Sequence, residues 1–487
     1  MENFLAPEIS RSSDQPAASP PLVVDLDGTL VKTDLLAESF FALVKQNALY
    51  VFSVLFWLFK GRAFLKRQIS QRVTLDVSLL PYHQELLNDL KARRARGCRL
   101  VLATASDERI AHQVADHLQL FDRIVASDGN INLSGRHKRD RLVAELGERG
   151  FDYAGNDGRD LTIWSSARKA IIVNSGRRLS RKAARSAEVE RVFGGREKWL
   201  KSYVQALRPQ QWLKNLLVFV PLVMAHRFFE PDLLANAFLA FWAFGLCASG
   251  VYLINDLLDL PADRHHPRKR QRPFAAGELP LSWGVASIPM LLGLSLLVSL
   301  FLPLHFLGML VIYFVLNLAY SFHLKRLVLL DVIVLAGLYT MRIMAGSAAV
   351  AIWPSSWLLA FSTFLFLSLA LVKRYAELVT MGAETGAVHV RGYQVIDKEL
   401  IASLGCGSGY VAVLVLAIYI SSGAAGILYT RQGFMWLLCP LLLYWISYVW
   451  LIAHRGGMDD DPLVFTIRNP VSRVVILLAV IILALAM

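Results

Sequence analysis

Long runs of apolar residues in the second half of the chain place the tightest limit on its fold. Residues 233–254 carry no charged side chain, and acids and then bases follow at once. An uncharged run of about 18 or more residues can cross a membrane as one helix. Nine such segments are predicted, the first and last of them short, near residues 213–226, 233–254, 281–302, 304–320, 328–348, 353–372, 400–421, 434–453 and 471–487. An all-α polytopic membrane domain is therefore expected over residues 208–487.

Basic residues are divided unequally among the loops between these segments. One set of alternate loops holds only Arg227 and Arg431 as bases. The other set is rich in bases: Arg264, Arg268, Lys269, Arg270, Arg272, Lys325, Arg326, Lys373, Arg374, Arg391, Lys398, Arg455 and Arg468. Basic loops face the cytoplasm in multi-pass proteins. The net charge of +13 thus indicates membrane topology rather than nucleic-acid binding. We expect a bacterial-type inner membrane protein whose active sites and N-terminal domain are cytoplasmic.

The first 211 residues have the charge density of a soluble domain. Residues 1–20 form a polar stretch without a signal peptide, and we expect them to be disordered. Residues 176–207 are rich in bases and are expected to form a helical linker along the membrane surface. The four cysteines show neither pairing nor metal-binding spacing, so a reduced structural role is expected.

The segment "PLVVDLDGTLVKTD" reads as an apolar strand that ends in a D-x-D-G-T turn. Asp25 and Asp27 would project from the carboxyl edge of a sheet, where open α/β folds place their sites. Two such carboxylates suit a metal ion. One of them can also attack phosphorus while the other carries a proton.

Three further segments continue the pattern. "CRLVLATAS" is a buried strand ending at Thr104, "GRHKRDRL" supplies Lys138, and "FDYAGNDGRD" runs into Asp157 and Asp160, after which "KAIIVN" would close the sheet. This order of motifs resembles the haloacid dehalogenase (HAD) phosphatase superfamily over about residues 20–175.

The resemblance implies a Rossmann-like α/β domain over residues 21–175. It makes Asp25 the nucleophile and Asp27 the general acid and base, with Thr104 and Lys138 on the phosphate. Mg²⁺ would be bound by Asp25, Asp27, Asp157 and Asp160. Asn156 stands where the family has an aspartate. An active phosphatase and a degenerate structural domain therefore both remain open.

A helical insert is predicted at residues 35–80, in the position of a HAD cap. Residues 47–59 within it are apolar but too few to cross a membrane. The flanking bases Lys60, Arg62, Lys66 and Arg67 would suit an anionic lipid surface. The insert is expected either to touch the membrane or to pack on its own domain.

Acids at helical spacing follow the apolar run at residues 233–254. Asn255, Asp259 and Asp263 are four residues apart and would share one face of a continuing helix, with Asp256 beside them. Carboxylates gathered in this way suit Mg²⁺ shared with substrate phosphates. The basic block at residues 268–272, including Lys269 and Arg272, can bind phosphates directly. Together these residues predict a diphosphate site.

Polar motifs at the ends of other membrane segments add candidate phosphate-binding residues. By helix parity they fall on the same side of the membrane, so one cavity is expected. Arg342 lies inside a predicted span, where a charge indicates function. The remaining candidates are Lys214, Asn215, Tyr320, Lys325, Lys373, Arg374 and Glu377.

Residues 205–487 resemble the UbiA superfamily of membrane prenyltransferases, through the N-D-x-x-D-x-x-x-D signature at residues 255–263. The second aspartate-rich motif of aromatic prenyltransferases is missing from "KRYAELVTMGAETG". "HPRKRQRP", "RPQQWLKN" and "KRYAEL" instead resemble decaprenyl-phosphate phosphoribosyltransferases. That resemblance implies 5-phosphoribosyl pyrophosphate (PRPP) as donor, a polyprenyl phosphate in the bilayer as acceptor, and Mg²⁺ as cofactor.

The two resemblances together predict a bifunctional enzyme. The membrane domain would install 5-phosphoribose on the lipid, with Asp259 and Asp263 central to catalysis, and the HAD-like domain would remove the 5-phosphate. The alternative enzyme is a prenyltransferase that moves a polyprenyl group from its diphosphate to an aromatic or other acceptor, with a vestigial or regulatory HAD domain. A transporter or lipid-binding scaffold is the non-enzymatic alternative.

Overall fold

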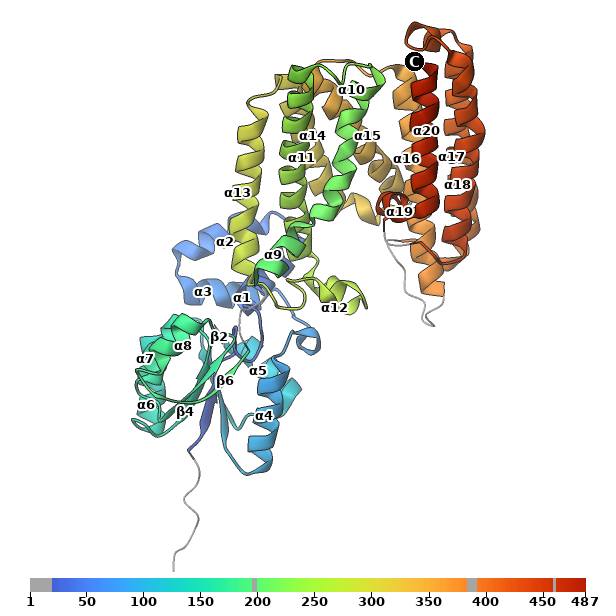
Figure 1. Cartoon of the computed structure of the whole chain (residues 1–487). Helices are drawn as coiled ribbons and strands as arrows, with labels where there is room; N and C mark the ends of the chain where they lie inside the picture. Colours follow the sequence, from blue (N-terminus) through green and yellow to red (C-terminus); the bar gives the residue numbers. More distant parts are fainter. Residues whose placement is uncertain (1–19, 195–198, 383–391, 459–460) are drawn as a thin grey trace, which may run out of the picture. The chain divides into compact units, whose positions relative to one another are not determined.

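A computed structural model describes residues 20–194, 199–382, 392–458 and 461–487 (Figure 1). All but the last residue of the predicted disordered tail lies outside these described residues. The chain divides into two compact units. The first unit comprises Met1–Tyr203 and Asp256–Trp283, and the second comprises Val204–Asn255 and Gly284–Met487. The aspartate-rich segment after residue 255 therefore belongs to the same unit as the N-terminal domain.

A six-stranded parallel sheet forms the centre of the first unit. Its strand order is β3-β2-β1-β4-β5-β6. The strands are β1 (Leu22–Val24), β2 (Leu100–Asp107), β3 (Arg123–Ser127), β4 (Asp152–Gly155), β5 (Lys169–Val173) and β6 (Glu188–Phe193). Val24 pairs with Leu102 on one side and with Ala154 on the other. The carboxyl ends of β1, β2 and β4 therefore meet at one edge of the sheet.

Helices cover both faces of this sheet, as the apolar strand sequences require. Leu22 and Val24 pack on the face covered by α4 (Gln84–Ala95) and α5 (Glu108–Leu118). Val23 points to the opposite face, where the fully buried Trp164 packs. That face is covered by α6 (Arg136–Leu146), α7 (Leu161–Trp164) and α8 (Arg177–Ala183) (Figure 1). The predicted α/β architecture is present.

The sheet extends further along the chain than predicted. β5 does not close it, because β6 pairs in parallel with β5 from within the segment predicted to be a linker. Most residues of β6 are exposed, as expected for an edge strand. Its charged residues made it look like a solvated connector. Residues 176–207 thus form α8, β6 and α9 (Trp199–Leu207) instead of one helical linker.

The insert after β1 is helical, as predicted. It consists of α1 (Leu35–Gln46), α2 (Tyr50–Phe59), α3 (Arg62–Ser70) and the short η1 (Val77–Leu79). Tyr50, Val54 and Trp57 of α2 pack against the domain core. Phe52, Phe56 and Phe59 on the same helix are 70%, 59% and 91% exposed. One face of α2 is therefore packed on the domain and the other is an exposed apolar face.

Long apolar helices make up most of the second unit. Seven helices in the described parts of the chain are long and apolar enough to cross a membrane. Their elements are α11 (Pro231–Leu258), α13 (Leu281–Ser299), α14 (Leu304–Phe322), α15 (Leu330–Val350), α16 (Ser356–Gly382), α17 (Lys398–Ser421) and α18 (Leu438–His454). An eighth crossing results if α19 (Pro462–Arg468) and α20 (Pro470–Ala486), bent by 81°, are one span.

The first of the nine predicted spans is not a single α-helix. Residues 209–224 form a 3₁₀ segment, η3 (Pro209–Phe219), followed by α10 (Val220–Met224). Pro221, in the first turn of α10, lacks the N–H that a continuous helix would need. At the usual rises the two parts extend about 30 Å. A crossing here remains a prediction.

η3 lies unusually close to the helix α15. A Cβ atom added at Gly346 would lie 2.0 Å from the carbonyl oxygen of Val218. Small residues allow such backbone approach between membrane helices. The contact fixes η3, and with it Lys214 and Asn215, against the helix that carries Arg342.

Candidate functional site

The strand order reverses direction beside β1, which places a crevice at the carboxyl edge of the sheet. Asp25 follows β1 directly, and its backbone N–H donates to the carbonyl of Ala154 at 3.0 Å. Lys138 from α6 reaches the same edge and donates to Asp25 Oδ1 at 2.6 Å. Both side chains are buried. The structure thus brings these two predicted site residues together.

Burial raises the pKa of Asp25 to about 7, against the opposing attraction of Lys138. The Lys138 ammonium also donates to the carbonyl of Ala103 at 3.1 Å and to the hydroxyl of Tyr153 at 3.2 Å. Three acceptors therefore hold the ammonium at the base of the crevice. A phosphate entering there would meet a fixed positive charge beside a carboxylate.

Asp27 is held by three donors. Its Oδ1 accepts from the backbone N–H of Leu35, the first residue of α1, at 2.8 Å. Its Oδ2 accepts from the hydroxyls of Ser106 at 2.7 Å and Thr104 at 3.2 Å. Thr104 thus lies in the predicted site, but bonded to Asp27. Ser106 was missed in the sequence, although it is only two residues beyond Thr104 in the quoted strand.

The two acids predicted at the end of β4, Asp157 and Asp160, differ in burial and in their partners. Asp160 is buried and accepts from the hydroxyl of Tyr153 and from the backbone N–H groups of Asn156 and Asp157, each at 2.9 Å. Its carboxylate therefore shapes the loop after β4. The side chain of Asp157 is 58% exposed and lies 3.5 Å from Arg159.

Asn156 lies against the D-x-D-G-T turn. Its Oδ1 accepts from the hydroxyl of Thr29 at 3.2 Å, and the same hydroxyl lies 3.3 Å from Asp25 Oδ2. A Cβ atom at Gly28, whose φ is +75°, would lie 2.0 Å from Asn156 Nδ2. Glycine at position 28 thus allows the Asn156 amide to approach the turn.

Lys66 follows the apolar helix of the insert, for which contact with lipid and packing on its own domain were both expected, and its ammonium turns toward the sheet. It donates to the carbonyl of Ala105 at 2.5 Å and to Asn132 Oδ1 at 2.7 Å. Arg67 likewise pairs with Glu108 at 2.7 Å. Basic residues next to an apolar helix look alike whether they meet lipid headgroups or their own domain.

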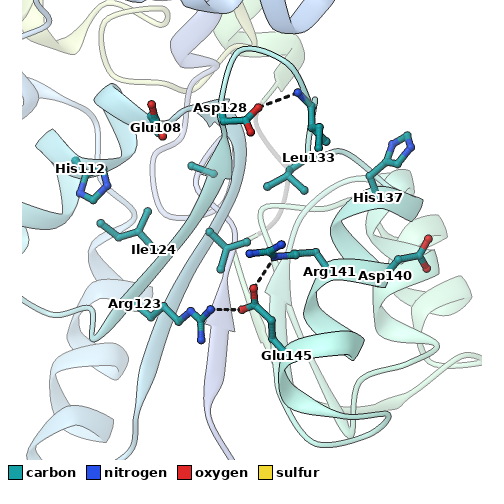
Figure 2. A pocket seen from close by; sticks show the side chains of 13 residues that line it. Glu108, His112, Arg123, Ile124, Asp128, Leu133, His137, Asp140, Arg141 and Glu145 are labelled. Carbon is teal, nitrogen blue, oxygen red and sulfur yellow. Dashed lines mark hydrogen bonds and ion pairs between the residues drawn. The ribbon is translucent and has the colours of Figure 1, made fainter.

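A surface groove between β3 and the helices α5 and α6 lies outside the predicted sites (Figure 2). Its described lining contains none of the predicted site residues. Glu145 in the groove is paired with Arg123 at 2.8 Å and with Arg141 at 2.5 Å. These arginines are thus engaged by Glu145, and no predicted chemistry falls in this groove.

The aspartate-rich segment does not continue α11 as one helix, contrary to the prediction. α11 ends at Leu258, and α12 (Leu260–His265) begins after a break at Asp259, with Pro261 in its first turn. Proline lacks the N–H that a continuous helix would need. The acids nevertheless remain close to one another through their basic partners.

Arg272 joins two of these acids. Its Nη1 lies 3.2 Å from Asp256 Oδ1 and 2.6 Å from Asp263 Oδ2. Burial raises the pKa of Asp263, and Arg272 opposes that shift, as does Lys269 more weakly. The predicted combination of acids with the bases Lys269 and Arg272 is therefore present in this loop.

Two further partners of the loop come from α1 and were not predicted. Lys45 Nζ donates to Asp259 Oδ1 at 2.8 Å. The carboxylate of Glu38 accepts hydrogen bonds from both terminal nitrogens of Arg264, at 2.7 and 2.5 Å. The partners are 214 and 226 residues apart in the chain. No local sequence pattern marks a pair so distant.

Oxygen atoms suited to a divalent cation are available in this loop. Carboxylate and amide oxygens are the ligands that Mg²⁺ prefers. Asn255 Oδ1 is buried without a hydrogen-bond partner. The described residues contain no ready group of three acidic, histidine or cysteine ligands. The donor chemistry fits Mg²⁺, and the carboxylates now engaged by Arg272 and Lys45 would have to turn toward it.

Arg342 is buried within the second unit and is fully engaged with polar and aromatic groups. It donates to Asn215 Oδ1 at 3.2 Å, to the Tyr313 hydroxyl at 3.0 Å and to the Leu338 carbonyl at 2.5 Å. The rings of Phe244, Tyr313 and Tyr339 lie 5.1 to 5.6 Å from its guanidinium carbon. Arg342 and Asn215, both predicted, therefore form one cluster.

Lys214 is paired with Asp461, and both side chains are buried. Asp461 was not among the predicted site residues, although it lies in the motif "RGGMDDDPLVF". Lys373 on α16 also acts electrostatically on Asp461. The motifs that contain Lys214, Lys373 and Asp461 thus converge, as expected from helix parity.

Arg374 was predicted to bind phosphate, but it is bound within the protein. It pairs with Asp331 and Glu377, and Arg374 and Asp331 are 1% and 0% exposed. The Tyr393 hydroxyl donates to the same Asp331 at 2.5 Å. This cluster joins α15, α16 and the segment before α17. Of the remaining predictions, Tyr320 lies near the end of α14 and Lys325 lies in η5 (Leu324–Arg326).

The second unit has the fold of a polytopic helical membrane protein. Residues 216–469, more than half of the chain, match the model of the UbiA prenyltransferase family. The chain belongs to this family and is therefore a multi-pass membrane transferase.

One similar protein matches nearly the whole chain, and two others match somewhat more than half of it. The uncharacterized protein y4nM of Sinorhizobium fredii is 33% identical over 93% of this chain and 88% of its own length. The decaprenyl-phosphate phosphoribosyltransferase of Mycolicibacterium smegmatis is 31% identical over 60% of this chain and 94% of its own length. The nodulation protein NoeC of Azorhizobium caulinodans is 36% identical over 57% of this chain and 90% of its own length.

Among solved structures, a UbiA homolog from Archaeoglobus fulgidus bound to DMAPP and Mg²⁺ covers 58% of this chain and 99% of its own. It is 18% identical, with a TM-score of 0.45.

The buried pair Asp331–Arg374 generates a stability prediction. Asp331→Ala leaves the arginine buried beside a single partial partner, so we expect a loss of about 3 to 5 kcal/mol. Thermal unfolding in detergent measures it, with the exposed Asp232→Ala as control. An unchanged melting temperature would show that the pair does not hold α15 to α16.

Proposed function

We propose that this chain transfers 5-phosphoribose from PRPP to a polyprenyl phosphate, and that its N-terminal domain then removes the 5-phosphate. Membership of the UbiA family carries the first half, together with relatives named decaprenyl-phosphate phosphoribosyltransferase. The second half is carried by Asp25, Asp27 and Lys138 at the carboxyl edge of a parallel sheet. This arrangement, with the motif order in the sequence, supports a HAD-like phosphatase.

In the transfer step, the bond from ribose C1 to the diphosphate breaks as an oxygen of the polyprenyl phosphate bonds to C1. Mg²⁺, held by Asp256, Asp259 and Asp263 with Asn255, would neutralise the leaving diphosphate when bound. Lys269 and Arg272 would bind its oxygens and stabilise the charge that develops there. Lys214, Lys325 and Lys373 carry the charge suited to the acceptor phosphate. That anion needs no base to deprotonate it.

Asp259→Asn tests the transfer step. Losing this carboxylate weakens cation binding and leaving-group stabilisation, so lipid labelling from PRPP should fall by about two orders of magnitude or more. Mass spectrometry of the lipid after incubation with PRPP, Mg²⁺ and polyprenyl phosphate measures the product.

Asp232→Asn, at the far end of α11 and exposed, is the matched control and should label lipid normally. Wild-type activity with polyprenyl diphosphate and an aromatic acceptor, but none with PRPP, would replace this function by the alternative prenyltransferase.

In the hydrolytic step, Asp25 attacks the 5-phosphate and forms an aspartyl-phosphate as the bond to the ribose 5-oxygen breaks. Asp27 gives that oxygen a proton and later takes one from the attacking water, which releases inorganic phosphate. Lys138 would neutralise part of the negative charge of the phosphate. Mg²⁺ fits the oxygens of Asp25, Asp27 and Asn156, and Asn156 offers an amide oxygen where a carboxylate was expected. Asp157 remains a candidate Mg²⁺ ligand. The hydrogen bonds of Asp160 instead give it a role in shaping the loop after β4.

Asp25→Asn separates the two steps. The amide cannot form the aspartyl-phosphate, so polyprenyl-phosphoryl-ribose should give way to its 5-phosphorylated precursor while transfer continues. Lipid mass spectrometry and phosphate release measure both. Asp116→Asn, an exposed acid on α5, is the control. The same dephosphorylated product from Asp25→Asn would refute the phosphatase.

The exposed face of α2 gives this phosphatase a means of meeting a lipid-borne substrate. Phe52, Phe56 and Phe59 form an apolar surface of a kind that peripheral helices bury at the bilayer boundary. Lys60 lies over the ring of Phe56 at 5.0 Å, and Arg62 follows. These bases complement an anionic membrane surface. We propose that this face of α2 rests on lipid.

Replacing all three phenylalanines by serine should weaken that contact. We expect a KM increase of about fivefold or more for the lipid-borne 5-phosphate in nanodiscs. Hydrolysis of soluble ribose 5-phosphate should not change. Serine at the exposed Ile131 and Val192 is the control. Equal effects on both substrates would mean that the substitutions damage the domain instead.

A further inference from the structure

The helix α1 contacts both candidate motifs of the first unit. Its first residue, Leu35, donates its backbone N–H to Asp27. Its last turn carries Lys45, which is bonded to Asp259 of the aspartate-rich loop. The helix has 12 residues, so about 18 Å separate its ends. One short rigid element therefore joins the D-x-D-G-T turn to the UbiA signature.

A buried ion pair fastens the loop to the middle of α1. Glu38 and Arg264 form two parallel hydrogen bonds, and their side chains are 3% and 6% exposed. Arg264 also donates to the carbonyl of Ala275 at 3.0 Å. Charge-assisted paired bonds of this kind fix direction as well as distance. The orientation of α1 relative to the loop is thereby set.

The backbone of the loop also lies directly against the N-terminal domain. Gly277 has a φ of +69°, and a Cβ atom there would lie 2.7 Å from the Cβ of Lys32 and 3.2 Å from Pro81. A side chain at this position would push the loop away. The contact is thus a packed one, made by backbone as well as by charge.

Lys45 differs from Arg264 in its exposure. The side chains of Lys45 and Asp259 are 28% and 24% exposed, so a ligand can reach the pair. A lysine ammonium sits on a flexible stem and can pass from a carboxylate to a phosphate oxygen without moving its helix. The loop already offers Arg272 beside Asp256 and Asp263. Lys45 adds a further cation at Asp259.

We propose that Lys45 is a phosphate-binding residue of the transferase, contributed by the N-terminal domain and positioned by the Glu38–Arg264 pair. Its ligand is the diphosphate of the donor, so the inference rests on the proposed function and deepens it. The insert after β1 thus serves the transfer step directly. Transfer needs this domain for Lys45 even when Asp25 is inactive.

The test compares Lys45→Gln with Lys45→Arg and with Lys91→Gln, an exposed lysine on α4, in the full-length protein. Initial transfer rates are measured against PRPP at saturating Mg²⁺ and polyprenyl phosphate. For Lys45→Gln we expect the KM for PRPP to rise about ten- to thirtyfold, with kcat changed less than about threefold. Lys45→Arg should stay within about threefold of wild type.

Lys45→Gln should leave hydrolysis of ribose 5-phosphate unchanged, because Lys45 lies in the last turn of α1, whereas Leu35 at its first residue contacts Asp27. An unchanged KM for PRPP would overturn the inference, and so would an equal loss in Lys45→Arg. A kcat loss without a KM change would also overturn it, because that result assigns Lys45 a structural role alone.

The positioning pair is tested by Glu38→Gln, alone and combined with Lys45→Gln. If Glu38 places Lys45, the second substitution should add less than about twofold to the KM rise of the first. Fully multiplicative effects would show that the pair does not position Lys45. The charge-reversed double variant Glu38→Arg with Arg264→Glu should recover part of the affinity. Thermal unfolding of every variant identifies those that fail to fold.

A binding measurement separates this inference from the choice of substrate. Calorimetry with Mg²⁺ and inorganic pyrophosphate compares wild type with Lys45→Gln. If the variant binds pyrophosphate more weakly than the wild type, but the wild type does not turn over PRPP, the proposed donor is refuted and Lys45 is retained as a diphosphate ligand. If the two proteins bind pyrophosphate equally and the wild type does turn over PRPP, the role of Lys45 is refuted and the proposed function is retained.

Discussion

The pairing of buried carboxylates with single basic side chains is the interaction on which both units depend. A buried charge without a partner costs several kcal/mol, so each buried acid needs a cation or hydrogen-bond donors beside it. Asp25 has Lys138, Asp263 has Arg272, and Asp331 has Arg374. The pairs Asp25–Lys138 and Asp331–Arg374 join elements distant in the chain, whereas Asp263 and Arg272 hold one loop in shape.

Such pairs explain which parts of the site could be predicted from the sequence. Asp25 follows the apolar strand β1 and Thr104 lies in the carboxyl-terminal half of the apolar strand β2. Parallel strands bring their carboxyl ends to one edge, so the proximity of these residues was predictable. Asp259 and Asp263 follow a long uncharged run, which marks them equally well. The partner of Asp259 was not predictable, because Lys45 lies 214 residues earlier on a helix with no distinguishing pattern.

Failed expectations share a physical cause. Arg374 was given an external partner, and for Lys66 both lipid and its own domain were left open, because a base at the edge of an apolar segment looks the same whether it meets a ligand, a lipid or its own protein. β6 was read as a linker because an edge strand tolerates charge that a central strand does not. The signature after α11 was read as one helix because its spacing is helical, whereas Pro261 breaks it.

Fusion of the two proposed activities has a physical rationale in the location of their shared intermediate. A polyprenyl chain keeps the phosphoribosylated product in the bilayer, so a phosphatase held at the same surface meets it at a high effective concentration. Tethering alone would provide this through any flexible linker. The Glu38–Arg264 pair and the close packing at Gly277 do more, because they fix the insert against the aspartate-rich loop. A fixed contact is needed when the N-terminal domain supplies a side chain to the transferase, and Lys45 is the side chain it supplies.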